Sequence, residues 1–260
     1  MEPLIEVKHL VKNFDDLVAV SDLSFSVYQG DVYGFLGQNG AGKSTTLRML
    51  LSLIHPGSGS IRLFGEELSV SKKAVLKRVG AVIERPDLYK YLSAKENLSI
   101  FSRMSGQKRS ERQQMEQLEM VGLADRANSK VSSFSQGMKQ RLGIAVALVH
   151  NPDLVILDEP TNGLDPQGIA DMRNLILHLS KERNKTVVVS SHLLSEIEQV
   201  ATRMIILDKG RKMVEGRVSD FFQPSRNKVQ LQVSDPQKVK DLLTRAPWNL
   251  PVEEWKQELV

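Results

Sequence analysis

The most informative run in this chain is Gly37-Gln38-Asn39-Gly40-Ala41-Gly42-Lys43-Ser44-Thr45. It fits the pattern G-x-x-x-x-G-K-[ST], in which glycines allow consecutive backbone N–H groups to face phosphate oxygens. The mostly apolar residues 31–36 before it are typical of a strand, and residues 44–53 have the pattern of a helix. The N-terminal end of such a helix favours an anion. A chance match would lack this context, so the run predicts nucleotide binding.

Two side chains of this loop carry distinct chemistry. Lys43 supplies a mobile cation for the β and γ phosphates of a nucleotide. The hydroxyl of Ser44 is a hard oxygen ligand of the kind that Mg²⁺ prefers. The loop therefore predicts ATP and Mg²⁺ as the cofactors.

Two carboxylates follow a second apolar strand, in the run Leu154-Val155-Ile156-Leu157-Asp158-Glu159-Pro160. A buried parallel strand delivers its C-terminal end to the crevice in which ligands bind. We expect Asp158 to hold the Mg²⁺ shell and Glu159 to act as the general base on the attacking water. The alternative is that the two acids only end a strand in solvent. The presence of a phosphate loop in the same chain disfavours this alternative.

The composition limits the class of protein. The chain has 260 residues, of which 41% are hydrophobic and 25% charged, so it can bury a substantial core. It has no cysteine, which excludes disulfides and thiolate metal sites and is compatible with a reducing cytoplasm. The 35 Lys and Arg against 31 Asp and Glu give a net charge of +4. This mild excess fits phosphates, an anionic membrane surface or plain solvation, and it is no nucleic-acid signature.

The sequence indicates no segment that enters a membrane. Residues 1–4 lack the basic and apolar pattern of a signal peptide. The longest apolar run, residues 142–149, is far shorter than the roughly 20 residues that span a bilayer. If this protein serves a membrane, other chains must do the spanning.

The order of elements predicts an α/β fold. Short strands are expected at residues 5–7, 18–20, 23–27, 60–64 and 79–83. The alternating pattern of residues 23–27 indicates an antiparallel N-terminal β-layer. Later, strands and helices alternate at residues 154–157, 166–181, 186–189, 194–200 and 204–207. This alternation predicts a mostly parallel sheet wrapped by helices.

A helical block separates these two parts. Residues 93–121 are helical and polar in pattern and begin with a capping box at Ser93 and Glu96, and residues 136–149 form a further helix. We therefore expect an inserted helical subdomain over about residues 91–152. Beyond residue 216 the pattern weakens to one strand at 228–233 and one helix at 236–245. The completeness of this end stays open.

With these motifs in this order, residues 4–216 resemble the ATP-binding domain of ATP-binding-cassette (ABC) transporters. The resemblance implies an ABC domain over residues 1–216 and a short C-terminal extension over residues 217–260. It also covers Ser135-Gln136-Gly137-Met138-Lys139-Gln140-Arg141, which resembles the family signature L-S-G-G-Q followed by x-Q-R. Phe134, Gln136 and Met138 depart from that signature. Read without the family, the run is an ordinary helix start.

The resemblance implies roles for several residues. Ser135, Gln136 and Gly137 would reach the γ-phosphate of ATP held by the other subunit, at a helix N-terminus. Asp165, in the loop that begins at Asn162, would touch the second subunit, and it also suits an N-cap for the helix that begins at Pro166.

Two further positions match aromatic and histidine motifs of the family. His192 resembles the switch histidine that contacts the γ-phosphate and the attacking water, whereas a lone histidine is more often structural. Phe14 occupies the position of an aromatic ring that stacks on adenine, with a core aromatic as the alternative. We expect the other histidines to be structural or surface residues: His9, His55, His150 and His178.

Glu84 is the main departure from the family, which usually has Gln at this position. A carboxylate there can still ligate Mg²⁺, so Glu84 joins Ser44 and Asp158 as a candidate metal ligand. Glu84, the Met138 variant and the run at residues 86–89 together resemble exporters linked to antimicrobial-peptide self-protection, drug efflux or lipid and polymer export.

The function implied is an ATP-binding and ATP-hydrolysing subunit that powers transport, with export favoured. It would act with a second copy of itself or a paralogous ATPase, on separate membrane permease subunits, at the cytoplasmic face of the membrane. No direct nucleic-acid partner is expected. One alternative is a soluble ABC-type ATPase acting on nucleic acid or the ribosome, but the chain lacks a second cassette, a coiled-coil insertion and zinc cysteines. Another is a regulatory nucleotide-binding module without catalysis, which the set Lys43, Asp158, Glu159 and His192 disfavours.

Overall fold

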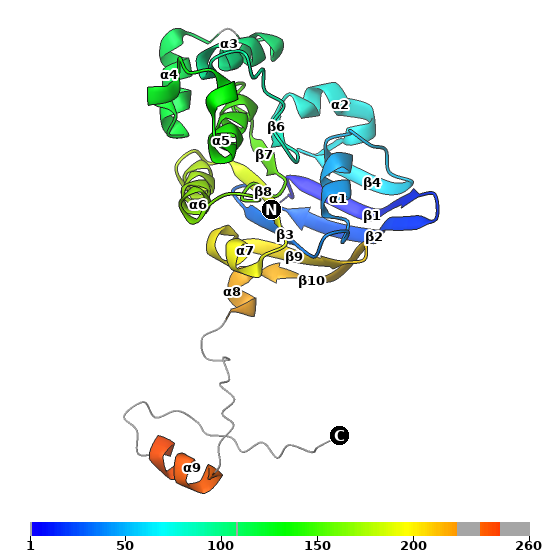
Figure 1. The fold of residues 1–260 in the computed structure, drawn as a ribbon. Helices are drawn as coiled ribbons and strands as arrows, with labels where there is room; N and C mark the ends of the chain where they lie inside the picture. Colours follow the sequence, from blue (N-terminus) through cyan, green and yellow to red (C-terminus); the bar gives the residue numbers. More distant parts are fainter. Residues whose placement is uncertain (1, 108, 223–234, 245–260) are drawn as a thin grey trace. The chain divides into compact units, whose positions relative to one another are not determined.

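The computed structural model describes residues 2–107, 109–222 and 235–244 (Figure 1). The chain forms two compact units, Met1–Phe221 and Phe222–Val260. The first unit extends through strand β10 (Arg211–Arg217) and helix α8 (Val218–Phe221), so the expected boundary at residue 216 falls inside β10. In the second unit, helix α9 (Pro236–Thr244) agrees with the helix predicted there. The strand predicted at residues 228–233 lies outside the described residues.

A four-stranded antiparallel sheet forms the N-terminal layer, in the order β2-β1-β4-β5. Its strands are β1 (Ile5–Phe14), β2 (Leu17–Val27), β4 (Ser58–Leu63) and β5 (Glu66–Glu67). The prediction of two separate strands at residues 18–20 and 23–27 was wrong, because both belong to β2. Asp22 between them takes a left-handed φ of 52°, and the pairing of β1 with β2 is irregular there, which blurs the alternation in the sequence.

The second sheet has six strands in the order β10-β9-β3-β8-β7-β6. They are β3 (Val32–Leu36), β6 (Val79–Val82), β7 (Leu154–Leu157), β8 (Thr186–Ser191), β9 (Arg203–Asp208) and β10. The first five of these run parallel, and β10 pairs antiparallel with β9. The predicted mostly parallel α/β core with an antiparallel N-terminal layer is therefore confirmed.

One apolar core joins the two sheets to helix α1 (Lys43–Leu50). Phe25, Tyr33 and Phe35 form an aromatic cluster inside it, with ring centroids 5.1–5.8 Å apart. Stacked and edge-on rings at this separation pack favourably. Because Tyr33 and Phe35 lie on β3, this core fixes the strand that leads into the phosphate loop.

The helical block lies beside the sheets as a group of its own (Figure 1). It contains α3 (Ala94–Met104), α4 (Glu111–Met120) and α5 (Gln136–Ala147), with two short 3-10 turns, Ala124–Arg126 and Val131–Ser133. The predicted capping box is present, because Ser93 accepts the N–H of Glu96 and the Glu96 carboxylate accepts the N–H of Ser93. The single stretch predicted at residues 93–121 is two helices, separated near Gly106, whose φ is 77°.

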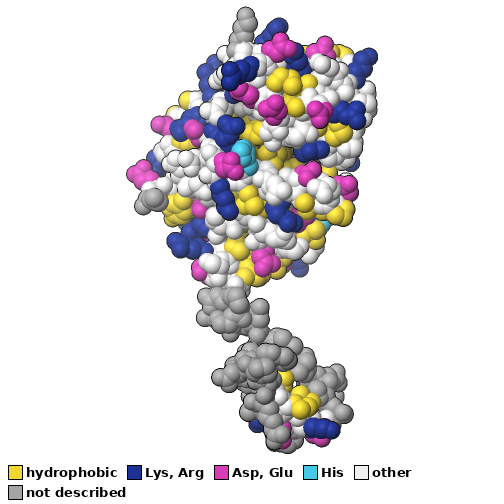
Figure 2. Space-filling view, turned by 90° about the vertical axis from the view of Figure 1, so that its left-hand side faces the viewer, with side chains coloured by type: hydrophobic (Ala, Val, Ile, Leu, Met, Phe, Trp, Pro, Cys, Tyr) yellow, Lys and Arg dark blue, Asp and Glu magenta, His cyan; other side chains and the backbone are white. Residues whose placement is uncertain are grey.

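The remaining helices are α2 (Leu68–Leu76), α6 (Pro166–Lys181) and α7 (Leu194–Val200). On the face shown in Figure 2, basic and acidic side chains are interspersed rather than gathered by sign. This face therefore fits the solvated-surface interpretation of the small net charge.

Candidate functional site

The site lies where β3, β7 and β8 end, since parallel strands bring their carboxyl ends to one edge. The phosphate loop follows β3 and ends at Gly42, whose φ of 98° is left-handed. A Cβ added at Gly42 would lie 2.6 Å from the carbonyl oxygen of Ala19, so both the backbone conformation and the space require glycine. This explains the second glycine of the motif.

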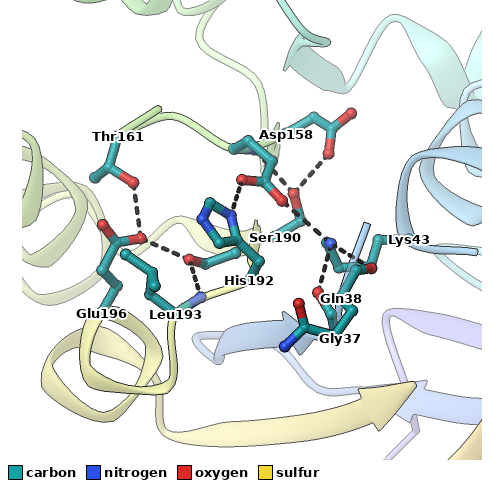
Figure 3. A network of polar contacts seen from close by, with 11 residues as sticks. Gly37, Gln38, Lys43, Asp158, Thr161, Ser190, His192, Leu193 and Glu196 are labelled. Atoms are coloured by element: carbon teal, nitrogen blue, oxygen red, sulfur yellow. Dashed lines mark hydrogen bonds and ion pairs between the residues drawn. The ribbon is translucent and has the colours of Figure 1, made fainter. Parts of the chain in front are cut away.

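Lys43 is held tightly at the start of α1. It is 5% exposed, and its ammonium donates to the carbonyl oxygens of Gly37 at 2.7 Å and Gln38 at 3.3 Å (Figure 3). The same ammonium lies 3.1 Å from Oε1 of Glu159. A buried cation needs such partners, because an uncompensated charge in this position would be costly.

A continuous polar chain runs from Lys43 through Glu159 to His192. Glu159 bonds Lys43 through Oε1 and the Nδ1 of His192 through Oε2, the second contact being 2.7 Å (Figure 3). Two loops that are far apart in the sequence thus place a carboxylate and an imidazole in direct contact. The structure brings together both residues that the sequence predicts to be catalytic.

Asp158 is fixed from the neighbouring strand. The hydroxyl of Ser190 donates to its Oδ1 at 2.6 Å and accepts the backbone N–H of Glu159 at 2.8 Å. Asp158 is 1% exposed, and its Oδ2 is buried without a hydrogen-bond partner. A buried carboxylate oxygen that lacks a donor fits a cation ligand. Ser44, half-buried in the first turn of α1, offers a hydroxyl oxygen as a ligand of the same kind.

Among the described residues, no three His, Cys, Asp or Glu side chains gather as a metal-binding group. A divalent ion here would therefore depend on phosphate oxygens and water for the rest of its shell, as Mg²⁺ in nucleotide sites does. The donor set fits Mg²⁺ bound together with a nucleotide.

Glu84 has its partner outside this group. It comes two residues after β6 with a left-handed φ of 59°, and its carboxylate forms an ion pair with Arg48 of α1. Its side chain is 63% exposed. Within the described residues its carboxylate contacts Arg48 rather than Asp158 or Ser44, so its role as a metal ligand stays a prediction.

The signature residues begin helix α5. Ser135 is the N-cap, and its Oγ accepts the N–H of Met138 at 3.3 Å, while Phe134 beside it is buried. Ser135 and Gln136 are exposed. In the part of the chain that the structure describes, no hydrogen bond or ion pair joins the signature to the phosphate loop. These side chains are therefore available to another molecule.

Asp165 and Phe14 are also on the surface. Asp165 caps α6 by accepting the N–H of Gly168 at 2.9 Å, which agrees with the expected structural role and leaves its contact with a second subunit untested. Phe14 ends β1 and is 43% exposed, so it is not a core aromatic. The ammonium of Lys12 lies 5.0 Å from the ring centroid of Phe14.

The remaining histidines have local partners or lie on the surface. His9 contacts Asp22, His178 contacts Glu182, and His55 is exposed. The ring of His150 bonds the carbonyl of Val79 at 3.1 Å, and burial lowers the pKa of His150. None of them lies in the Lys43–Glu159–His192 chain, as expected.

Sequence reasoning missed four polar residues around the site: Thr161, Ser190, Ser191 and Glu196. Ser190 and Ser191 end a strand that is buried along its whole length. Two hydroxyls at the end of such a strand need partners, and the acids after the neighbouring strand can supply them. Serines at the end of one buried strand and acids after its neighbour could therefore have predicted these polar contacts from the sequence.

A glycine-rich loop at a helix N-terminus, two acids after β7 and a histidine after β8 together define a P-loop ATPase. A family model described as ABC transporter matches residues 20–162. The chain belongs to the ABC transporter family, and it is an ATP-binding subunit with an ATPase site. No helix among the described residues is both long and apolar enough to cross a bilayer.

Related proteins agree with this assignment. The chain is 47% identical over 243 residues to the bacitracin transport ATP-binding protein BcrA of Bacillus licheniformis, covering 94% of this chain and 79% of that protein. It is 37% identical to the Nod factor export ATP-binding protein I of Burkholderia orbicola, covering 92% and 80%. These relatives favour a transport ATPase over the soluble alternative.

A solved structure agrees with the fold. It is described as the dimeric, post-hydrolysis state of an ATP-binding cassette bound to ADP and Pi. It is 26% identical to this chain with a TM-score of 0.73, and the match covers 82% of this chain and 98% of that one.

Proposed function

We propose that ATP is hydrolysed at the Lys43–Glu159–His192 chain and that the released energy drives export through separate membrane permease subunits. The observation that carries the proposal is the pair of contacts made by Glu159, with Lys43 at 3.1 Å and with His192 at 2.7 Å. A carboxylate fixed on both sides is suited to orient a water molecule for in-line attack.

The chemistry assigned to each group is simple. As the water oxygen bonds to the γ-phosphorus, the bond from that phosphorus to the β–γ bridging oxygen breaks, and ADP leaves. Glu159 takes the water proton. Lys43 and His192 hold the γ-phosphate oxygens, on which negative charge lies in the transition state. The phosphate competes with Glu159 for the Lys43 ammonium, so nucleotide binding frees the carboxylate to face the water.

Asp158 and Ser44 are the residues proposed to hold Mg²⁺, with Glu84 as a third candidate. The buried Oδ2 of Asp158, which lacks a donor, supports this assignment. The ion supplies positive charge to the β and γ phosphates when it is bound. The adenine base would stack on Phe14, whose exposed ring is available.

A second copy of the chain, or a paralogous ATPase, would complete each site. The exposed helix start at Ser135, Gln136 and Gly137 would contact ATP held by the phosphate loop of the partner, and Asp165 would lie at the same interface. A twofold axis then produces two equivalent sites from one surface. The dimeric cassette of known structure supports this arrangement. The complex would sit peripherally at the cytoplasmic face of the membrane.

The substitution Glu159→Gln tests the proposal. The amide keeps a hydrogen-bonding side chain in place but cannot take the water proton, so hydrolysis should fall by about 100-fold or more. ATP affinity should change by only a few fold. Steady-state phosphate release and equilibrium nucleotide binding measure the two effects.

Glu198→Gln, an exposed change on α7, is the matched control and should leave both quantities unchanged. Hydrolysis near the normal rate in Glu159→Gln would remove Glu159 from its role. Loss of ATP binding in the folded variant would also contradict the proposal, since it would place the carboxylate in nucleotide binding.

A further inference from the structure

A second polar network lies beside the first and links the same two loops. Both of its hydrogen bonds end on one atom, Oε2 of Glu196 in helix α7 (Figure 3). The hydroxyl of Thr161 donates to this oxygen at 2.8 Å, and the hydroxyl of Ser191 donates to it at 2.6 Å. Among the described residues, no cation forms an ion pair with Glu196, so two hydroxyls are its partners.

The two donors stand next to the catalytic pair in the sequence. Thr161 comes two residues after Glu159, and Ser191 comes directly before His192. Ser191 also accepts the backbone N–H of Leu193 at 3.0 Å, so its hydroxyl both donates and accepts a hydrogen bond next to His192. Glu196 therefore joins the segment that carries the proposed base to the segment that carries the histidine.

The sheet does not join these two segments to each other, although β8 still pairs with β3 as far as Ser191. The pairing of β7 with β8 ends at Leu157 and Val189, before either catalytic residue is reached. Glu159 also has a φ of 47°, a left-handed conformation that costs a non-glycine residue free energy unless its surroundings hold it. Ser190 holds the Glu159 backbone from one side, and the Thr161–Glu196 bond holds the same loop from the other.

The network is partly buried, since Thr161 and Glu196 are half-buried. Ser191 is 2% exposed. The network borders a small hollow lined by Pro160, Ile169, Ile176, Val189, Ile197 and Val200 together with the half-buried Arg173. A hydrogen bond to a carboxylate is stronger where water is excluded, and the loss of the acceptor leaves the buried hydroxyl of Ser191 without an acceptor.

We propose that Glu196 is a positioning residue for ATP hydrolysis, which sets the geometry of the Glu159–His192 pair by holding Thr161 and Ser191 together. Glu196 touches neither nucleotide nor water in this role. The inference rests on the proposed function, because it assumes that Glu159 and His192 act on the attacking water. Small displacements of such groups have large effects on rate and small ones on binding.

Glu196→Ala tests the proposal. It should lower kcat for ATP hydrolysis about tenfold or more, since misplacing a catalytic group by about 1 Å can cost up to a hundredfold. The Kd for ATP should stay within about twofold, because the phosphate loop is not touched. Glu196→Gln should restore most of kcat, since both bonds use a single oxygen that an amide also offers.

Thr161→Val provides an independent arm, since it removes one donor with little change in shape. It should lower kcat, and the double variant Thr161→Val/Glu196→Ala should be no slower than Glu196→Ala alone, as expected for groups that act through one contact. Glu198→Ala, on the exposed side of the same helix, is the control and should retain normal kcat. If Glu196→Ala does not fold, Thr161→Val and Glu196→Gln still decide the matter.

Three results would overturn the proposal. These are a kcat for Glu196→Ala equal to that of Glu198→Ala, equal losses for the Ala and Gln variants, and full additivity with Thr161→Val. The proposed function fails separately, if Glu159→Gln continues to hydrolyse ATP. If Glu159→Gln is inactive and Glu196→Ala is normal, the base assignment stands and the positioning role is wrong.

Discussion

Two regions of this molecule are proposed to contact ATP, one the chain's own nucleotide and the other the nucleotide of the partner, and they differ in how they are supported. At the ends of β7 and β8, Asp158, Ser190 and Ser191 are at most 2% exposed and bond one another or their neighbours. At the start of α5, Ser135 and Gln136 are exposed, with only a capping bond between Ser135 and its own helix. The region proposed to act on water is therefore held by contacts within the chain, whereas the start of α5 has few such contacts and is the region proposed to meet a second molecule.

The largest effect is expected inside the self-completed region. Lys43→Ala removes the buried cation, so hydrolysis should fall by about 100-fold or more, the usual cost of removing a donor that stabilises transition-state charge. ATP affinity should fall at least about tenfold, since bonds to charged groups contribute about 1.5–3 kcal/mol. Phosphate release and nucleotide binding are the measurements.

Lys181→Ala, which removes an exposed lysine at the end of α6, is the matched control. If Lys43→Ala is folded and keeps its ATP affinity, the phosphate loop is not the element that binds ATP. The contrast between the two regions then no longer holds for the first of them.

The next largest effect is expected in the exposed region. It should change dimerisation of the chain rather than ATP binding to the monomer. Glu159→Gln should dimerise when ATP and Mg²⁺ are present, because hydrolysis no longer reopens the complex. Adding Ser135→Arg should abolish this dimer, since a long cation at the helix start crowds the γ-phosphate of the partner site. Light scattering with and without ATP and Mg²⁺ measures both results, and ATP binding to the monomer should persist.

A dimer that survives Ser135→Arg would show that the start of α5 is not at the interface. A Glu159→Gln protein that stays monomeric at saturating ATP would instead assign closure to the membrane subunits. Ser133→Arg, on an exposed residue of the turn just before α5, tests whether any nearby arginine has the same effect.

The smallest effect is expected at Phe14, which lies on the surface within a single chain. Base–aromatic stacking contributes about 1 kcal/mol at its lower end, so Phe14→Ala should weaken ATP binding about fivefold. Phe14→Tyr should keep the affinity, and Val70→Ala, an exposed apolar change on α2, is the control. A Phe14→Ala protein with unchanged affinity for ATP would place the adenine elsewhere.

The sequence was sufficient for the fold class and for the residues of the phosphate loop. Lys43, Asp158, Glu159 and His192 could be found because each follows an apolar strand, and strand ends converge in an α/β fold. The strand order, by contrast, puts β3 between β8 and β9, and no local pattern states which distant strands are neighbours.

Local sequence patterns could not predict the contacts that hold the site either, because these contacts join residues that are distant in the sequence. The bonds of Glu196 join residues up to 35 positions apart, and an acid in an amphipathic helix looks like any solvated residue. The ion pair of Glu84 with Arg48 spans 36 positions and was likewise not foreseen. β5 is only two residues long, and β10 is half exposed, so neither leaves a strong pattern.

The left-handed backbone of Glu159 has a consequence for how this chain tolerates mutation. Its φ of 47° is a conformation that glycine adopts freely and that costs other residues about 1 kcal/mol or more. At this position the backbone therefore favours glycine, while the chemistry proposed here requires a carboxylate. A glutamate at this position therefore lowers local stability in return for hydrolysis. Such a trade-off between stability and activity is common where activity needs a strained site. In an inactive variant such as Glu159→Gly, the relief of backbone strain should for this reason offset part of the stability lost with the Lys43 and His192 contacts.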